Sequence, residues 1–446
     1  MDRSVSLSPA DVHQALGRSL LVDGFPIVLD LAASRGCDLV DAITGDRYLD
    51  LFGFFGSNAL GMNHPLMTRP EIVAELGRIA LHKPSNSDMY TVAMAEFVET
   101  FRRVLGDPRL PHLFFIEGGG LAIENALKAA FDYKSRLNES RGLSPTLGSQ
   151  VMHLQYAFHG RTGYTMSLTN TDPTKTARFP AFDWPRISAP YLGTDSDGRP
   201  RPVAELEAKS LAEATRAFEV HGADIAAFIV EPIQSEGGDH HFRPEFLQAM
   251  QELVHSNDAL FIVDEVQTGV GMSGTAWAYQ QLGLEPDLVA FGKKTQVCGV
   301  MAGGKLDEIP ENVFNVSSRI NSTWGGNLTD MVRARYTLEI IESERLFDHA
   351  AEVGAWLLAE LQELAQRQPL VSNPRGRGLL CAFSLPDTAT RDALLAELAA
   401  RNVLILGCGQ RSIRFRTPLT VSVDDLRRGL AVIDETLSAL TPASVS

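Results

Sequence analysis

A series of short apolar segments, separated by helix-like stretches, constrains the fold more than any other feature of the sequence. These segments are residues 112–116, 151–154, 225–230, 260–263 and 288–291. Continuous apolar strands are typical of a parallel sheet that helices cover on both faces. The sequence therefore predicts an α/β fold with a mostly parallel central sheet. Because ligands bind such sheets at the carboxyl ends of the strands, the residues after each segment are the first candidates for function.

Composition changes along the chain and predicts its domain organisation. Residues 66–328 contain the apolar segments and are expected to form a large domain. Residues 329–446 combine amphipathic helical patterns with short strands, which indicates a smaller α+β domain. Within it, Ser422 and Asp425 resemble a capping box and predict the start of the last helix. Residues 1–65 are expected to contribute to the smaller domain.

Charge and composition exclude several classes of partner. The 446 residues include 40 basic and 55 acidic ones, a formal net charge of −15, which argues against nucleic acid or an anionic membrane surface as a partner. No apolar run approaches the roughly 18 residues of a membrane span, and no signal peptide is evident. The four cysteines lack metal-ligand spacing. We therefore expect a cytoplasmic protein with no membrane partner, no metal and buried cysteines.

Three glycines follow the first apolar segment. Gly118, Gly119 and Gly120 lie directly between residues 112–116 and an Ala-rich helical stretch at 121–131. Backbone N–H groups at such a helix start can bind phosphate, although a tight turn would use the same residues. The run matches neither common nucleotide-binding glycine pattern, so the sequence favours a phosphate group over a nucleotide.

A carboxylate follows the segment 260–263. Asp264 at the end of a buried strand needs a partner, and a protonated pyridine nitrogen is a suitable one. Val266 would then press against a ring face and Gln267 could reach a ring hydroxyl. For Asp264 alone, a helix cap or a core ion pair would be the better explanation.

Two lysines follow the segment 288–291. If the chain is extended there, Lys293 and Lys294 point to opposite faces, so only one can enter a site and form a Schiff base. A lysine pair is otherwise usually solvated. The glycine turn, Asp264 and a lysine each follow a strand of one predicted sheet, and this combination fits pyridoxal 5'-phosphate (PLP).

Several motifs resemble a known family. EPIQSEGG, DEVQTG, the Gly292-Lys293 pair and TWGGN resemble the class III aminotransferases, which are PLP enzymes of fold type I with a large domain and a smaller α+β domain. Longer stretches are similar to members of this class that act on lysine: HKPSNSD, FHGRTGYTMSLTNT, ARFPAFDWPRI, AFGKKTQVCGVMAG and NSTWGGNLTDMVRAR.

The resemblance implies a role for each cofactor-binding residue. It selects Lys293 as the Schiff-base lysine, Asp264 as the partner of the ring nitrogen and Gln267 as the group near the ring hydroxyl. Phe158 would stack on the ring face opposite Val266. The phosphate would be held by Gly119, Gly120 and, from the neighbouring subunit, Thr323, which implies a homodimer with shared sites.

The resemblance also implies the substrates, L-lysine and 2-oxoglutarate, in a ping-pong transfer of the ε-amino group. Arg161 would bind the α-carboxylate of lysine, because arginine binds carboxylates bidentately. Arg414 would bind 2-oxoglutarate near the reacting carbon, and Glu236 would neutralise Arg414 while lysine is bound. Asn321 and Phe55 complete the expected substrate-binding residues.

Two departures from the family pattern and two alternatives accompany this interpretation. Many members have a hydroxyl residue where this chain has a third glycine, so backbone donors and Thr323 are expected to hold more of the phosphate. Phe54 and Phe55 are bulky and predict a pocket of different width. The alternatives are an aminotransferase for another ω-amine, such as ornithine, 2,4-diaminobutyrate or 4-aminobutyrate, and a non-catalytic PLP-fold binding protein.

Overall fold

A seven-stranded sheet forms the centre of the computed structural model, which describes residues 7–195 and 198–440. Only β11 runs antiparallel to its neighbours, so the sheet is mostly parallel, as predicted. In spatial order the strands are β3 (His112–Ile116), β11 (Cys298–Ala302), β10 (Leu288–Phe291), β9 (Leu260–Asp264), β6 (Ile225–Val230), β4 (Gln150–Leu154) and β5 (Arg186–Ile187). The five predicted strands are confirmed, while β11 and the short β5 were not expected.

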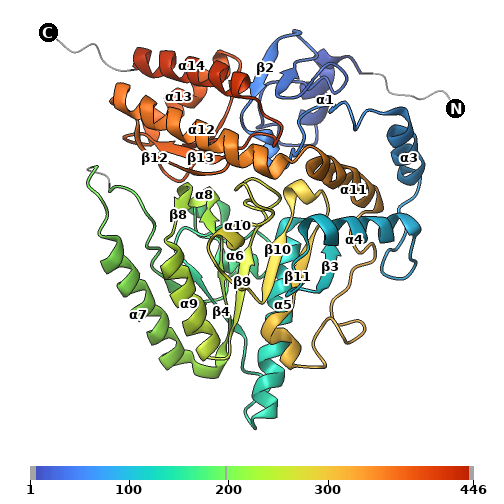
Figure 1. Cartoon of the computed structure of the whole chain (residues 1–446), viewed down its shortest axis with the longest axis vertical. Helices are drawn as coiled ribbons and strands as arrows, with labels where there is room; N and C mark the ends of the chain where they lie inside the picture. The colour runs from blue at the N-terminus through green and yellow to red at the C-terminus, as the bar shows by residue number, and fades with distance from the viewer. Residues whose placement is uncertain (1–6, 196–197, 441–446) are drawn as a thin grey trace.

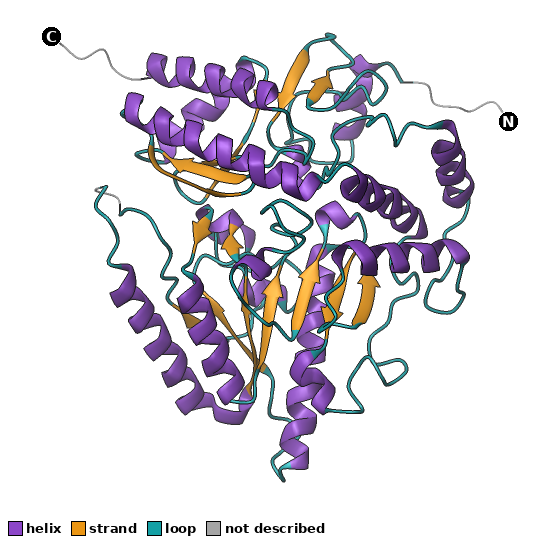
Figure 2. Ribbon diagram, viewed as in Figure 1, coloured by secondary structure: helices purple, strands orange, loops and turns teal. Residues whose placement is uncertain are grey.

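Helices cover both faces of this sheet (Figure 2). Side chains of β9 alternate between two cores: Phe261 and Val263 belong to one, Leu260 and Ile262 to the other. The first core also contains buried residues of α4 (Val92–Leu105) and α9 (Pro244–Ser256), and the second those of α5 (Gly119–Ser140). Small side chains such as Ala122, Ala126 and Ala129 let α5 approach the sheet closely. This arrangement confirms the predicted α/β fold with a mostly parallel, helix-covered central sheet.

Two smaller sheets lie at one end of the molecule (Figure 1). One joins β1 (Asp38–Val40) and β2 (Arg47–Asp50) to β14 (Val403–Leu404), so the N-terminal region pairs directly with the C-terminal one. The other contains β12 (Ser372–Arg377), β13 (Leu380–Ser384), β16 (Ser412–Arg414) and β15 (Leu406–Cys408). The helices beside them are α12 (Leu346–Arg367), α13 (Thr388–Ala400) and α14 (Val423–Leu440). The exact domain boundaries at residues 65 and 328 stay predictions.

The remaining elements include connections and further helices that pack on the first core, such as α7 (Val203–His221) and α11 (Leu328–Ser343). The others are η1 (Pro9–Asp11), α1 (Val12–Gly17), α2 (Gly53–Gly56), α3 (Pro70–Ala80), α6 (Thr165–Leu168), η2 (Pro173–Lys175), η3 (Gly222–Asp224), β7 (Ile233–Gln234), α8 (Ser235–Gly238), β8 (His240–His241), α10 (Ala278–Gln281), η4 (Lys293–Thr295) and η5 (Gly304–Glu308). Along residues 7–195 and 198–440, no helix is both long and apolar enough to cross a bilayer.

The predicted capping box at the start of α14 is confirmed. The backbone N–H of Asp425 donates to Ser422 Oγ at 3.1 Å, and that of Ser422 donates to Asp425 Oδ2 at 3.2 Å. These bonds satisfy donors that a helix start leaves free.

A buried ion pair joins the C-terminal part to the segment between α8 and β8. Arg416 follows β16 and Asp239 follows α8, and their side chains are 0% and 1% exposed. Arg416 Nη1 donates to Asp239 Oδ2 at 3.0 Å, while Nη2 contacts Oδ1. Removing one partner of such a pair leaves the other charge buried and uncompensated, which is costly.

We expect Asp239→Asn to lower the free energy of unfolding by about 3–5 kcal/mol, measured by chemical denaturation. Asparagine keeps the shape of the side chain and tolerates the left-handed backbone of this residue, with φ 50°, so the change isolates the charge. Asp424→Asn is the control, because its pair with Arg427 is 87% and 63% exposed and is worth less than about 1 kcal/mol. Equal losses for the two variants would contradict the role given to the buried pair.

Candidate active site

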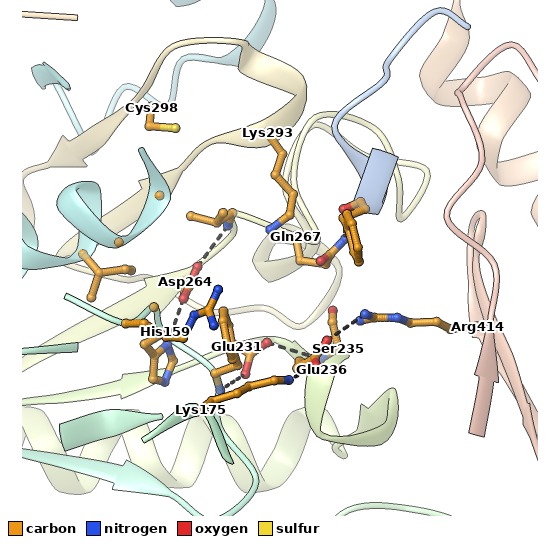
Figure 3. Close-up of a pocket in the computed structure, with 18 residues that line it drawn as sticks. His159, Lys175, Glu231, Ser235, Glu236, Asp264, Gln267, Lys293, Cys298 and Arg414 are labelled. Carbon is orange, nitrogen blue, oxygen red and sulfur yellow. Dashed lines mark hydrogen bonds and ion pairs between the residues drawn. The ribbon is translucent and has the colours of Figure 1, made fainter. Parts of the chain in front are cut away.

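A cavity of about 530 Å³ lies where the strands of the large sheet end (Figure 3). Most of the residues predicted from the sequence line it: Phe55, Gly119, Gly120, Phe158, Arg161, Glu236, Asp264, Val266, Gln267, Lys293 and Arg414. Asn321 and Thr323 do not; they lie on an exposed loop before α11. The lining residues that the sequence did not single out are Ile123, His159, Gly160, Lys175, Glu231, Ser235 and Cys298.

The glycine run leaves the start of α5 open to this cavity. Gly118 has φ 99°, a conformation that favours glycine, and α5 begins at the next residue. A Cβ on Gly119 would lie 2.9 Å from Val266 Cγ1, and one on Gly120 would lie 3.3 Å from Thr162 Cγ2. The free N–H groups and the dipole of α5 therefore face the cavity without side chains in the way, which suits a phosphate.

Asp264 lies at the end of β9 and is held from two sides. His159 Nδ1 is 2.8 Å from its Oδ2, and the backbone N–H of Val266 donates to its Oδ1 at 3.0 Å. His159 is buried, and its Nε2 has no hydrogen-bond partner in the described part of the chain. This histidine fixes the carboxylate in position while leaving the cavity side of Asp264 available to a cationic group.

Both lysines after β10 are placed differently from the extended-chain prediction, which was wrong. Lys293 has φ 56° and begins the 3₁₀ turn η4, so the two side chains do not alternate across a strand. Lys293 lines the cavity (Figure 3), whereas the Lys294 ammonium is buried against the carbonyl of Gly56. Lys294 is therefore not a solvated surface residue.

The environment of Lys293 favours a neutral amine. Burial lowers its pKa, with Arg414 acting in the same direction, and the attraction of Asp264 and Glu231 offsets this only in part. A neutral amine is the nucleophilic form of lysine. The position thus suits a lysine that reacts with a carbonyl group.

Glu236 lies between two cations at the other side of the cavity (Figure 3). Arg414 Nη2 donates to Glu236 Oε2 at 2.7 Å, and the Lys175 ammonium contacts Oε1. Burial opposes ionisation of Glu236, but the two cations outweigh it and lower its pKa. Arg414 Nε and Nη1 have no partner among the described residues, so the guanidinium can donate hydrogen bonds to a further carboxylate.

Phe55 and Gln267 are in contact with each other at the rim. Gln267 Nε2 donates to the Phe55 carbonyl at 3.0 Å, and Phe55 has φ 60° with 57% of its surface exposed. Arg161 also lines the cavity and is exposed, without an ion pair in the described segments. Phe55 and Arg161 thus lie at the solvent side of the cavity.

Along the sequence, the cavity is lined first by the glycine turn that suits an anion, then by the carboxylate of Asp264, and then by Lys293. PLP enzymes of fold type I have these groups in the same order. The family model for class III aminotransferases matches residues 22–437, so the chain belongs to the class III aminotransferases and is a PLP-dependent enzyme.

Relatives within this family are similar over nearly their whole length. The chain is 62% identical to an L-lysine-epsilon aminotransferase of Mycobacterium tuberculosis over 438 residues, 97% of each chain. It is 57% identical to one from Amycolatopsis lactamdurans over 434 residues, 96% of each. A solved structure of the M. tuberculosis lysine aminotransferase superposes with a TM-score of 0.95 at 62% identity, covering 98% of this chain and 100% of that one.

The residues present fit PLP. The open start of α5 suits its phosphate, and Asp264 suits a protonated ring nitrogen. Lys293 reaches the same cavity. The assignments of individual roles to these residues remain predictions, but each group that the cofactor needs has a counterpart in the wall.

We expect Gly119→Ala to weaken PLP binding, because Val266 is β-branched and cannot easily move away from the added methyl group. Overpacking of about 1–3 kcal/mol corresponds to a roughly 5- to 150-fold larger dissociation constant. Titration of the apoenzyme with PLP, followed by absorbance, measures it. Gly77→Ala in α3 is the control, since its Cβ would meet no atom within 4 Å. Unchanged affinity in Gly119→Ala would contradict a phosphate site at this turn.

Proposed function

We propose that this aminotransferase transfers the ε-amino group of L-lysine to 2-oxoglutarate, giving 2-aminoadipate 6-semialdehyde, which cyclises, and L-glutamate. The relatives named L-lysine-epsilon aminotransferases support the amino donor. The main support for the proposal is the Glu236–Arg414 ion pair. This pair would allow Arg414 to be neutralised for one substrate and available to bind a carboxylate of the other.

The two substrates place opposite demands on Arg414. Lysine must present its ε-amine to the reacting centre while its α-carboxylate stays far away, and an unpaired Arg414 would attract that carboxylate to the wrong end. Glu236 neutralises Arg414 and prevents this. 2-Oxoglutarate carries a carboxylate beside its reacting carbon, so Arg414 must become available when the acceptor enters. Arg161 would bind the distal carboxylate of either substrate.

When bound, PLP supplies an aldehyde that condenses with amines and a ring that accepts the electrons released when a C–H bond breaks. The N–H groups of Gly119 and Gly120 would hold its phosphate, and Asp264, positioned by His159, would hold the proton on its ring nitrogen. Phe158 and Val266 would enclose the ring, with Gln267 near its hydroxyl.

Lys293 performs the proton transfers in this scheme. Lys293 Nζ would take the proton that leaves the ε-carbon of lysine and carry it for the transfer. Its lowered pKa favours the neutral base that this step requires. In the second half-reaction the same nitrogen moves the proton in the reverse direction.

A homodimer with shared sites is part of the proposal. Exposed apolar side chains gather at Leu81, Met89, Tyr90 and Val92, and this segment contacts the loop that carries Thr323: Ser87 Oγ donates to the Ser322 carbonyl at 2.6 Å, and Lys83 lies 3.8 Å over the Trp324 ring. A second copy that covered this surface would receive Thr323 and Asn321 near its own cavity. This accounts for two predicted site residues that the cavity of one chain lacks.

We also propose that the protein works in the cytoplasm. All four cysteines are free and buried, which suits a reducing compartment.

We expect Lys293→Ala to abolish transamination and to prevent borohydride from fixing the cofactor to the protein, since Lys293 is the lysine proposed to form the bond. Lys294→Met is the matched control: it keeps the buried stem, removes the neighbouring amine, and should still give a reduced adduct that peptide mapping assigns to residue 293. An adduct at Lys294 in the wild type would contradict the assignment, and no adduct at all would favour a non-catalytic binding protein.

A panel of amino donors tests the substrate. With 2-oxoglutarate as acceptor, we expect kcat/KM to be highest for L-lysine and at least about tenfold lower for ornithine and 4-aminobutyrate, a difference of about 1.4 kcal/mol in transition-state binding. Glutamate formation measures all donors in the same assay. Faster turnover of ornithine than of lysine would overturn the substrate assignment while leaving the chemistry intact.

A further inference from the structure

The carboxylate of Glu236 has one cation on each oxygen, and these cations differ in kind. Arg414 lies on β16 with its side chain 3% exposed, and it binds Oε2. Lys175 ends η2, is 26% exposed and contacts Oε1. The arginine is buried, whereas the lysine is partly exposed and carries its charge at the end of a flexible side chain. The family resemblance did not indicate Lys175.

Glu236 must leave Arg414 if that guanidinium is to bind a substrate carboxylate. Without another partner, the departing carboxylate would be left unpaired in a site where burial already opposes its ionisation. Lys175 removes that cost, because it stays bound to Oε1 while the contact between Oε2 and Arg414 breaks. Only one of the two ion pairs then has to be exchanged for the incoming substrate.

A second cavity provides space for this movement. It has a volume of about 520 Å³, and Lys175 and Glu236 line both this cavity and the catalytic one. Arg391 also lines the second cavity, but its guanidinium already donates to the Gly409 carbonyl and pairs with Asp392. Lys175 is thus the cation that faces both cavities next to Glu236.

We infer that Lys175 is a positioning residue for the acceptor half-reaction: it draws Glu236 toward the second cavity when Arg414 binds the carboxylate beside the reacting carbon of a 2-oxo dicarboxylate. The inference rests on the proposed function in that it assumes a dicarboxylate acceptor. In the donor half-reaction, Glu236 needs only to remain on Arg414, and Lys175 is not required for that.

The test separates the two half-reactions by stopped-flow absorbance in Lys175→Met, which removes the charge and keeps the length of the side chain. We expect the KM for 2-oxoglutarate to rise about five- to tenfold, the effect of losing a partly buried ion pair, with kcat changed less than the KM. The half-reaction with L-lysine should stay within about twofold of the wild type. Lys175→Arg should restore most of the loss, and Lys209→Met, at a side chain that is 62% exposed, should change neither half-reaction.

A binding measurement gives an independent readout. Glutarate is an unreactive dicarboxylate, and its dissociation constant, measured by calorimetry on the holoenzyme, should rise by the same factor in Lys175→Met. In a Glu236→Gln background the neutral amide no longer needs a cation, so Lys175→Met should then have no further effect on glutarate binding.

The inference is overturned if Lys175→Met impairs the two half-reactions equally, if it leaves glutarate binding unchanged, or if its effect persists in the Glu236→Gln background. Failure of the proposed function looks different. In that case the wild type itself does not turn over 2-oxoglutarate. Glutarate binding to the wild type, Lys175→Met, Glu236→Gln and the double variant then still decides whether Lys175 acts through Glu236.

Discussion

The carboxyl edge of the mostly parallel sheet is the constraint on which the site depends. Strands β3, β6, β9 and β10 run in one direction, so the glycine turn, Glu231, Asp264 and Lys293 leave the sheet at the same edge. The start of α5 faces that edge because α5 follows β3 directly. The antiparallel strand β11 begins where its neighbours end, and its first residue, Cys298, joins the same cavity wall. Groups from distant parts of the chain are thereby brought within reach of one small ligand.

Burial at this edge also controls the charges of the cavity. Glu231 is buried, and burial, together with the nearby Asp264, raises its pKa well above the usual range even though the N–H groups of Phe158 and Ser235 donate to it. The bonds of Asp264 to His159 and Val266 fix this carboxylate beside the cavity, where it can interact with a cation.

The sequence predicted those parts of the structure that are determined by residues close to one another in the chain. Strands β6 and β10 have the predicted ends because polar or glycine residues flank them and because they are buried along their length. The capping box of α14 was predictable because its residues are three positions apart. Strand β11 was not, because its place between β3 and β10 is decided by pairing with both.

The same distinction between local sequence and tertiary contacts applies to the site residues. Asp264 and the lysine pair were found because each follows an apolar strand. The turn at Lys293 was not predicted, because side-chain alternation assumes an extended chain. His159 and Lys175 were missed because their significance depends on tertiary contacts: His159 meets Asp264 across 105 positions of the sequence, and Lys175 meets Glu236 across 61. A histidine or lysine outside a strand does not by itself indicate a role in the site; the role becomes evident only when its contact partner is known.

The distribution of charge explains how an acidic protein can handle anionic substrates. The net charge of −15 repels carboxylates in general, so binding must come from cations placed in the cavity itself. Arg161 is exposed at its rim and Arg414 is buried in its wall, with Glu236 and Lys175 beside the latter. In the proposed mechanism Arg414 is paired in one state and free in another, which changes the effective charge of the wall without any change in the backbone. Two substrates of different charge can then be bound in turn at a single reacting centre.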